Sequence, residues 1–156
     1  MRIGIVGPES TGKSTLAQSL VKRLHGTWVP EYARQYVEQK GSTEVSYEEL
    51  CSIARQQIAE MAQQPDDPTS IIVYDTELII TKVWFDYAFH RVPEWLEEAI
   101  RRYPMDIYLL CLPDMAWQPD PARTNGSDAI RMELLQRYEQ EIRELGIPYY
   151  FIRHQS

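Results

Sequence analysis

Gly7-Pro8-Glu9-Ser10-Thr11-Gly12-Lys13-Ser14 is the stretch that decides the fold, because it matches the pattern G-x-x-x-x-G-K-S. In this pattern successive backbone N–H groups curl around a bound phosphate, and the amino end of the following helix adds partial positive charge. The two glycines permit backbone angles and close approaches that a Cβ would block. The stretch therefore predicts a phosphate-binding loop for a nucleoside triphosphate.

The residues on either side of the loop predict the strand and the helix that the motif requires. Arg2-Ile3-Gly4-Ile5-Val6 is short, apolar and rich in β-branched residues, as in a buried strand. Residues 15–24 have helical spacing, with Leu16, Leu20 and Leu24 on one face. An ordinary glycine turn that caps a helix is the alternative, and the flanking strand and helix disfavour it.

Individual side chains of the loop have distinct expected roles in binding ATP with Mg²⁺. Lys13 is expected to reach the β- and γ-phosphates, and the Ser14 hydroxyl is expected to ligate Mg²⁺. The full set of nucleotide contacts expected in this stretch is Gly7, Glu9, Ser10, Thr11, Gly12, Lys13, Ser14 and Thr15.

The composition of the 156-residue chain is typical of one globular domain, residues 1–156. The net charge of −7 disfavours a nucleic-acid partner, whose phosphates attract a basic surface. Cys51 and Cys111 lie far apart in the sequence, which argues against a metal site or a disulfide framework. No leader segment and no membrane-length apolar run is visible, so we expect a cytoplasmic protein.

Apolar stretches alternate with helical stretches along the chain, which predicts an α/β fold. The expected strands are residues 2–6, 27–29, 71–75, 106–112 and 148–153, and the expected helices are 15–24, 31–38, 50–62, 77–89, 93–102 and 129–145. The third strand is nearly all apolar, so we expect it to be buried on both faces and parallel to its neighbours. The fold class is a three-layer P-loop NTPase fold with a five-stranded parallel sheet and helices on both faces.

The third expected strand ends in Asp75, as a Walker B strand does. The aspartate of such a strand holds Mg²⁺ directly or through water. The alternative is that Asp75 only caps the amino end of the next helix. We favour the metal role because a phosphate loop exists in the same chain, and the two roles are compatible.

The segment after the second expected strand holds candidates for binding a second substrate. Glu31, Arg34 and Glu38 share one helix face, and Tyr32 and Tyr36 lie on the neighbouring face. Ligands of α/β sheets bind at the carboxyl ends of strands, so Glu31 is a candidate for the acceptor hydroxyl or the metal shell, and Arg34 for phosphate or substrate. The alternative is a solvated acidic first turn with a paired arginine, and spacing alone favours neither.

Two later segments add further candidates. Trp84 lies in the expected helix 77–89 near the sheet edge, where it either stacks on a base or packs in the core. Residues 114–128 are rich in proline and polar residues and are expected to form a lid. Arg123 and Arg131 flank this loop, and an arginine over the γ-phosphate stabilises the charge of the transition state. The alternative for both is a solvated surface arginine.

Classes of P-loop protein differ in motifs that can be compared with this chain. A GTPase is disfavoured because N-K-x-D and D-x-x-G are missing and Asn125 is the only asparagine. A hexameric motor ATPase is disfavoured because the third strand ends in Asp75-Thr76 instead of Asp-Glu, and the chain is too short for a helical lid domain. A small-molecule kinase fits best.

The chain resembles the ribosylnicotinamide kinase domain of the NadR family, which consists of P-loop nucleoside kinases. The resemblance covers nearly the whole chain, and it rests on residues 7–14, 28–34, 74–77 with Thr81 and Trp84, 106–113 with Trp117, Asp120 and Arg123, and 146–149. It implies transfer of the ATP γ-phosphoryl group to the ribose 5′-hydroxyl of nicotinamide riboside, which gives nicotinamide mononucleotide.

The resemblance also implies roles for individual residues. Lys13 and the loop amides would hold the phosphates, while Ser14 and Asp75 would hold Mg²⁺. Glu31 or Asp75 would accept the hydroxyl proton or orient that oxygen. The arginines expected to close over the transferring phosphoryl group are Arg123 and Arg131. The nucleoside contacts expected from the resemblance are Glu31, Tyr32, Arg34, Tyr36, Asp75 and Trp84.

The chain departs from the family pattern in several places. Glu77 stands where the family often has aspartate, and its longer side chain is expected to alter how the ribose is held. Pro121-Ala122 replaces a glycine-containing pair and is expected to stiffen the lid. The chain stops soon after the last strand and shows no adenylyltransferase domain, so no conversion of the mononucleotide to NAD is expected.

Other functions stay open at this point. A P-loop ATPase or a nucleotide-dependent regulatory module would share every phosphate-loop feature but would lack a small-molecule acceptor. A kinase for another nucleoside would differ only in the second pocket. Preference for ATP over GTP and the oligomeric state are also left open, and a small-molecule nucleoside is the expected partner.

Overall fold

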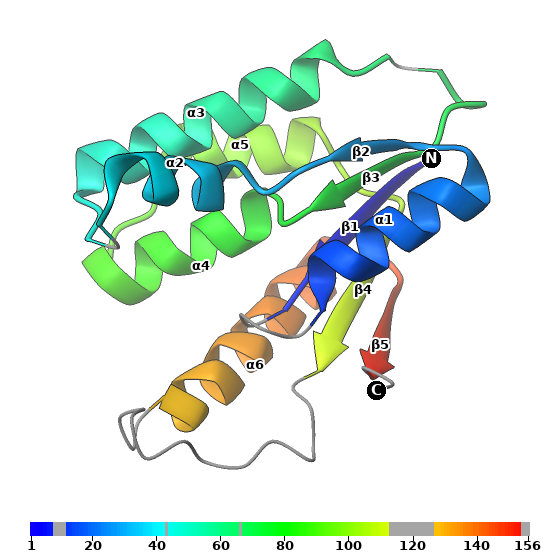
Figure 1. The fold of residues 1–156 in the computed structure, drawn as a ribbon. Helices are drawn as coiled ribbons and strands as arrows, with labels where there is room; N and C mark the ends of the chain where they lie inside the picture. Colours follow the sequence, from blue (N-terminus) through cyan, green and yellow to red (C-terminus); the bar gives the residue numbers. More distant parts are fainter. Residues whose placement is uncertain (8–11, 43, 66, 113–126, 154–156) are drawn as a thin grey trace.

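The computed structural model describes residues 1–7, 12–42, 44–65, 67–112 and 127–153, and it contains one five-stranded sheet (Figure 1). The strands are β1 (Arg2–Val6), β2 (Thr27–Val29), β3 (Ile72–Asp75), β4 (Ile107–Leu112) and β5 (Tyr149–Arg153). Their order is β2-β3-β1-β4-β5, and all neighbours are parallel. The predicted five-stranded parallel sheet is confirmed.

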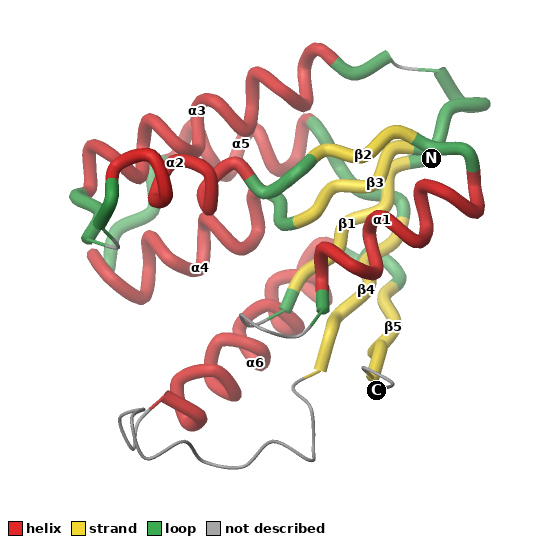
Figure 2. The backbone as a smooth tube through the Cα atoms, viewed as in Figure 1, coloured by secondary structure: helices red, strands yellow, loops and turns green. Residues whose placement is uncertain are grey.

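Helices cover the two faces of the sheet as separate layers (Figure 2). They are α1 (Lys13–Leu24), α2 (Tyr32–Lys40), α3 (Tyr47–Gln63), α4 (Leu78–Phe89), α5 (Glu94–Arg102) and α6 (Ser127–Leu145). Helix α1 packs on one face, against β1, β2 and β3, whereas α3, α4, α5 and α6 belong to the core on the other face. This arrangement confirms the predicted three-layer fold class.

Side chains of the central strands alternate between these two cores, as the pleat of a strand requires. Ile5 and Val73 face α1, while Tyr74 and Tyr108 face the core formed with α3 to α6. Every residue of β3 is buried, so the prediction that this strand is covered on both faces is confirmed. None of the helices in the described ranges combines the length and apolarity needed to cross a bilayer.

Some local expectations differ from the structure. Leu24 is 40% exposed, because the buried stripe of α1 runs through Ala17 and the half-buried Leu16, Leu20 and Val21 instead. Helix α6 begins at Ser127, so the predicted lid of 114–128 overlaps its first two residues. Residues 114–126 of that prediction lie outside the described residues.

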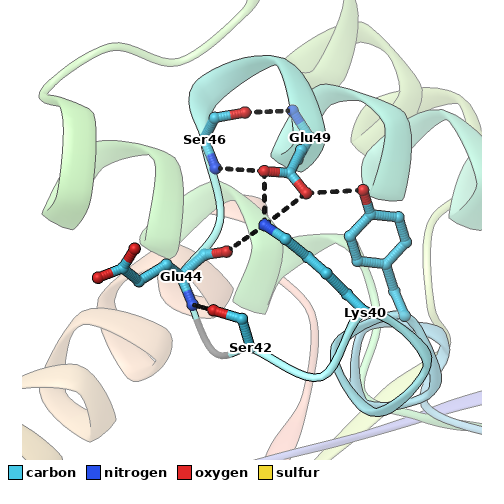
Figure 3. A network of polar contacts seen from close by, with 6 residues as sticks. Lys40, Ser42, Glu44, Ser46 and Glu49 are labelled. Carbon is cyan, nitrogen blue, oxygen red and sulfur yellow. Dashed lines mark hydrogen bonds and ion pairs between the residues drawn. The ribbon is translucent and has the colours of Figure 1, made fainter.

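A polar network joins the end of α2 to the start of α3 (Figure 3). The Ser46 hydroxyl accepts from the Glu49 N–H at 3.1 Å, and the Glu49 carboxylate accepts from the Ser46 N–H at 3.2 Å, so the two residues form a capping box at the start of α3. The Lys40 ammonium and the Tyr36 hydroxyl also donate to this carboxylate, at 2.8 and 2.9 Å. Hydrogen bonds from Lys40, the Ser46 backbone and Tyr36 lower the pKa of Glu49 to about 2. The network fixes α2 against α3.

Candidate functional site

The described ends of the phosphate-loop stretch are Gly7, at the carboxyl end of β1, and Gly12 to Ser14, at the amino end of α1 (Figure 1). At Gly7 the backbone has a φ of 153°, and a Cβ there would lie 2.6 Å from the Cys111 carbonyl oxygen. Gly12 has a φ of 81° and is the N-cap of α1. Both positions therefore require glycine. The expected contacts Glu9, Ser10 and Thr11 lie outside the described residues.

The loop sits at the point where the connections of the sheet change direction. The chain runs from β1 toward β2 on one side of the sheet, and from β4 toward β5 on the other. The crevice at the carboxyl ends of such strands is where ligands bind in open α/β sheets. The fold thus places the loop at the expected ligand edge.

Lys13 is the first residue of α1, and its side chain reaches back to Gly7, which follows β1. The residue is only 7% exposed, and Nζ donates to the Gly7 carbonyl oxygen at 2.8 Å. A buried ammonium at the amino end of a helix adds its charge to that of the unpaired helix N–H groups. Thr15 follows on the same helix turn. This end of α1 can therefore hold negatively charged phosphate oxygens.

Ser14 in the first turn of α1 and Asp75 at the end of β3 are brought together by the fold. The Ser14 hydroxyl donates to Asp75 Oδ2 at 2.6 Å, and Asp75 is 1% exposed. Asp75 Oδ1 is buried and has no hydrogen-bond partner among the described residues. A buried carboxylate oxygen without a partner is unfavourable unless a cation or a donor reaches it. Hydroxyl and carboxylate oxygens are the ligands that Mg²⁺ prefers.

The described residues contain no cluster of three or more His, Cys, Asp or Glu side chains placed to hold a metal. Mg²⁺ is commonly bound by one or two carboxylates together with substrate phosphates and water. Ser14 and Asp75 fit a site of that kind. The alternative role of Asp75 as a helix cap is wrong, because Glu77 is the N-cap of α4 and accepts from the Ile79 N–H at 3.0 Å.

A cavity of about 530 Å³ opens beside the end of β3, between α2, α3 and α4. This volume lies within the range of small-molecule sites. Its polar lining includes Thr76 and Thr81, together with three candidates from the sequence, Glu31, Arg34 and Trp84. The remaining lining residues are Ala33, Val37, Glu38, Val45, Leu50, Ile53, Ile80, Ala88 and Phe89. The cavity is therefore mostly apolar with a few acidic and basic groups at its wall.

Glu31 and Arg34 form an ion pair on this wall, with 3.7 Å between Nε and Oε2. The Arg34 side chain is 52% exposed and that of Glu31 is 18% exposed. Glu31 is the N-cap residue of α2, but its side chain makes no capping hydrogen bond. The paired arginine of the alternative interpretation is present, and the same pair faces a substrate-sized cavity.

Other candidates lie apart from the cavity. Neither Tyr32 nor Tyr36 lines it; their ring centroids are 6.4 Å apart, and Tyr36 is engaged by Glu49. Arg131 lies near the start of α6 and is half-buried. Arg123 falls outside the described residues. The structure thus groups Glu31, Arg34 and Trp84 at this cavity, and neither tyrosine is part of its lining.

The sequence analysis assigned no individual role to three buried polar residues at or next to the cavity. They are Gln57, Thr76 and Thr81. The Thr81 hydroxyl donates to Gln57 Oε1 at 2.7 Å, which joins α4 to α3. A signal for Gln57 was available, since it falls on the inward face of α3 with Ile53 and Met61. Thr76 belongs to the block 74–77 of the resemblance, but its position at the cavity depends on how β3 ends.

Glu77 lies in the core instead of at the substrate cavity. It is 4% exposed, and its Oε1 also accepts from the Tyr108 hydroxyl at 3.0 Å. Burial raises the pKa of Glu77 to about 7, although hydrogen bonds from Ile79, Tyr108 and Leu78 act in the opposite direction. Glu77 does not line the cavity, so the structure gives its longer side chain a capping role and no contact with a ribose there.

The raised pKa of Glu77 predicts a pH-dependent stability. Between pH 4.5 and about 7 the native chain holds a proton on Glu77 that the unfolded chain releases. The stabilisation that this proton gives the native chain is therefore full below pH 4.5 and is lost as the pH rises from there through the folded pKa of about 7. Glu77→Gln cannot ionise, so we expect its urea midpoint to rise relative to that of the wild type as the pH is raised from about 5 to about 8. A difference in urea midpoint that does not change with pH would contradict this prediction. Glu98→Gln, at an exposed site on α5, is the control.

Comparison with protein-family models matches residues 2–156 to the family described as "AAA domain". The trifunctional NAD biosynthesis/regulator protein NadR of Escherichia coli (strain K12) is 27% identical over 152 residues, which cover 94% of this chain and 37% of that protein. The NadR of Salmonella typhimurium (strain LT2) is 24% identical over 156 residues, covering 97% of this chain and 38% of the relative. The chain therefore spans less than two fifths of the length of these curated relatives.

A solved structure of NadR protein in complex with NR superposes with a TM-score of 0.77 at 21% identity, covering 96% of this chain and 43% of that one. At this identity the superposition demonstrates a shared fold. The elements that carry the phosphate loop and the cavity belong to the superposed part, because nearly all of this chain is covered.

Proposed function

The chain belongs to the AAA domain family, and from that premise we propose that it binds ATP and transfers its γ-phosphoryl group to a small-molecule hydroxyl. The observation that carries this proposal is the position of the Ser14–Asp75 pair and Lys13 beside a cavity of about 530 Å³. A site for phosphates next to a site for a small molecule is what phosphoryl transfer between two bound substrates requires.

For the phosphate side, Lys13 and the loop amides would bind the β- and γ-phosphates. Ser14 Oγ and Asp75 would hold Mg²⁺, which neutralises charge that develops on the transferring group. Arg123 of the expected lid, about 114–128, and Arg131 near the start of α6 are proposed to approach that group when substrates are bound. All of these groups are donors or cations apart from Asp75, as a polyphosphate requires.

For the acceptor side, we propose nicotinamide riboside, which would be phosphorylated on its ribose 5′-hydroxyl to give nicotinamide mononucleotide. The similarity to NadR, whose structure is described in complex with NR, supports this choice. Trp84 on the cavity wall offers an aromatic face, and Glu31 and Glu38 offer negative charge, both of which suit a cationic pyridinium ring. Arg34 is proposed to bind substrate oxygens at the open side.

We propose Glu31 as the group that orients the acceptor hydroxyl or takes its proton. Glu31 lines the cavity, whereas Asp75 does not line it and is engaged by Ser14. Tyr32 and Tyr36 are proposed to support α2, which carries Glu31, instead of contacting substrate. A small-molecule partner in the cytoplasm agrees with the net charge of −7 and with two buried, free cysteines.

The test is ADP release from Mg-ATP with nicotinamide riboside, adenosine, uridine, thymidine or no acceptor. We expect strong stimulation by nicotinamide riboside and formation of the mononucleotide. ADP release that no acceptor stimulates would overturn the kinase proposal and favour an ATPase or a regulatory module. Stimulation by a different nucleoside alone would keep the reaction type and replace the substrate.

A further inference from the structure

Three buried polar side chains surround a second, much smaller cavity behind the substrate-sized one. This cavity has a volume of about 10 Å³, and its lining includes Gln57 of α3, Tyr74 of β3 and Thr76. Each of these residues is at most 6% exposed. Gln57 Nε2, Tyr74 Oη and Thr76 Oγ1 have no hydrogen-bond partner within the described residues. Three buried polar atoms without a partner therefore belong to residues that line one cavity.

Unsatisfied polar groups at this density are unfavourable in a dry core. Each buried donor or acceptor without a partner costs roughly 1–3 kcal/mol, and native proteins contain few of them. The Gln57 Oε1 accepts from the Thr81 hydroxyl at 2.7 Å, on the other side of the amide from Nε2. The Nε2 group is therefore left as a donor that faces the side of the small cavity.

The cavity has the size and the chemistry of a site for one water molecule. A buried water needs roughly 10–15 Å³ of space and two to four polar partners. The observed volume is about 10 Å³, and the lining offers the Gln57 amide, the hydroxyls of Tyr32, Tyr74 and Thr76, and the carboxyl groups of Glu60 and Glu77. A dry cavity, by contrast, is typically lined by apolar groups alone.

Thr76 connects this small cavity to the functional site. It lines both cavities and lies between Asp75 and Glu77 in the chain. Its φ is 70°, which is unfavourable for a β-branched residue and persists only where the surroundings hold it. Its N–H donates to the Ile5 carbonyl oxygen at 3.0 Å, but its side chain is held by no hydrogen bond within the described part of the chain.

We propose that one ordered water molecule occupies the small cavity and completes the support of the Thr76 turn. The water accepts a hydrogen bond from Gln57 Nε2 and exchanges hydrogen bonds with the hydroxyls of Tyr74 and Thr76. It thereby ties α3 to the end of β3 at the residue that follows Asp75. This water supports the fold at this edge of the sheet whatever acceptor the larger cavity binds.

The direct test is a crystal structure of the wild-type chain at a resolution that shows ordered waters. We expect one solvent peak in the cavity, within hydrogen-bond distance of Gln57 Nε2 and of at least one of the two hydroxyl oxygens. An empty cavity would overturn the proposal, and so would direct hydrogen bonds among the three side chains that close it.

The sign of a stability change provides an independent test. Tyr74→Phe removes only the hydroxyl and does not touch the larger cavity. If a water satisfies that hydroxyl, the urea midpoint of Tyr74→Phe falls below that of the wild type. If the hydroxyl is unsatisfied in a dry core, the midpoint stays or rises, and the proposal is overturned. Tyr150→Phe, at a residue that is 60% exposed on β5, is the matched control and should leave the midpoint unchanged.

Discussion

Lys13→Met is expected to reduce kcat/KM for Mg-ATP by about 1,000-fold, the scale of a lost cationic donor in phosphoryl transfer. The ammonium is buried at the amino end of α1, 2.8 Å from the Gly7 carbonyl oxygen, so no neighbouring side chain on that helix replaces its charge there. Methionine retains the apolar stem of the lysine, which limits the structural change. Steady-state ADP release and equilibrium binding of ATP measure the effect.

The matched control is Lys22→Met on the same helix, at an exposed position away from the loop. It removes the same charge from the chain and should keep kcat/KM within about twofold of the wild type. Equal activity of Lys13→Met and the wild type would contradict a nucleotide site at this loop. Loss of activity in both variants would point to a general effect of net charge instead.

Asp75→Asn should lower kcat by about 100- to 1,000-fold and raise the Mg²⁺ concentration needed for half-maximal rate. An asparagine oxygen can still accept the hydrogen bond that Ser14 donates at 2.6 Å, so the local geometry is retained while the negative charge is lost. A neutral amide is a much weaker ligand for a hard divalent cation than a carboxylate. A Mg²⁺ titration of the rate at saturating ATP measures both changes.

The stability of Asp75→Asn separates this effect from unfolding. Asp75 is 1% exposed and its Oδ1 has no hydrogen-bond partner in the described ranges, so removal of the charge should leave the urea midpoint unchanged or raise it. Asp86→Asn on α4, whose carboxylate is paired with Arg137 at the surface, should retain the Mg²⁺ dependence of the wild type. An unaltered Mg²⁺ dependence in Asp75→Asn would contradict the metal role of Asp75.

The phosphate loop could be predicted from the sequence because its chemistry is local. Gly7, Gly12, Lys13 and Ser14 lie within eight consecutive positions, and the strand and helix on either side are set by short-range apolar spacing. The pairing of Ser14 with Asp75 spans 61 positions, yet it could also be predicted from the sequence. Parallel strands bring their carboxyl ends to one edge, so an acid that ends a buried strand lies near the loop.

The residues of the acceptor side could be predicted only in part from the sequence. Glu31, Arg34 and Trp84 were candidates from their positions near strand ends, and the structure brings them to one cavity. Tyr32 and Tyr36 were equally good candidates in the sequence but do not line that cavity. Helical spacing defines which residues share a face, but the face that meets the cavity depends on how α2 packs against α3.

The sequence by itself therefore determined the loop, the parallel sheet, the two helical layers and the acid at the end of β3. These follow from local backbone requirements and from apolar patterns, which act over a few residues. Only the tertiary structure decided the strand order, the roles of Gln57 and Thr76, and the burial of Glu77 against Tyr108. Those features depend on which surfaces of α3, α4 and the sheet come together, because burial and unsatisfied hydrogen bonds exist only once distant segments are packed.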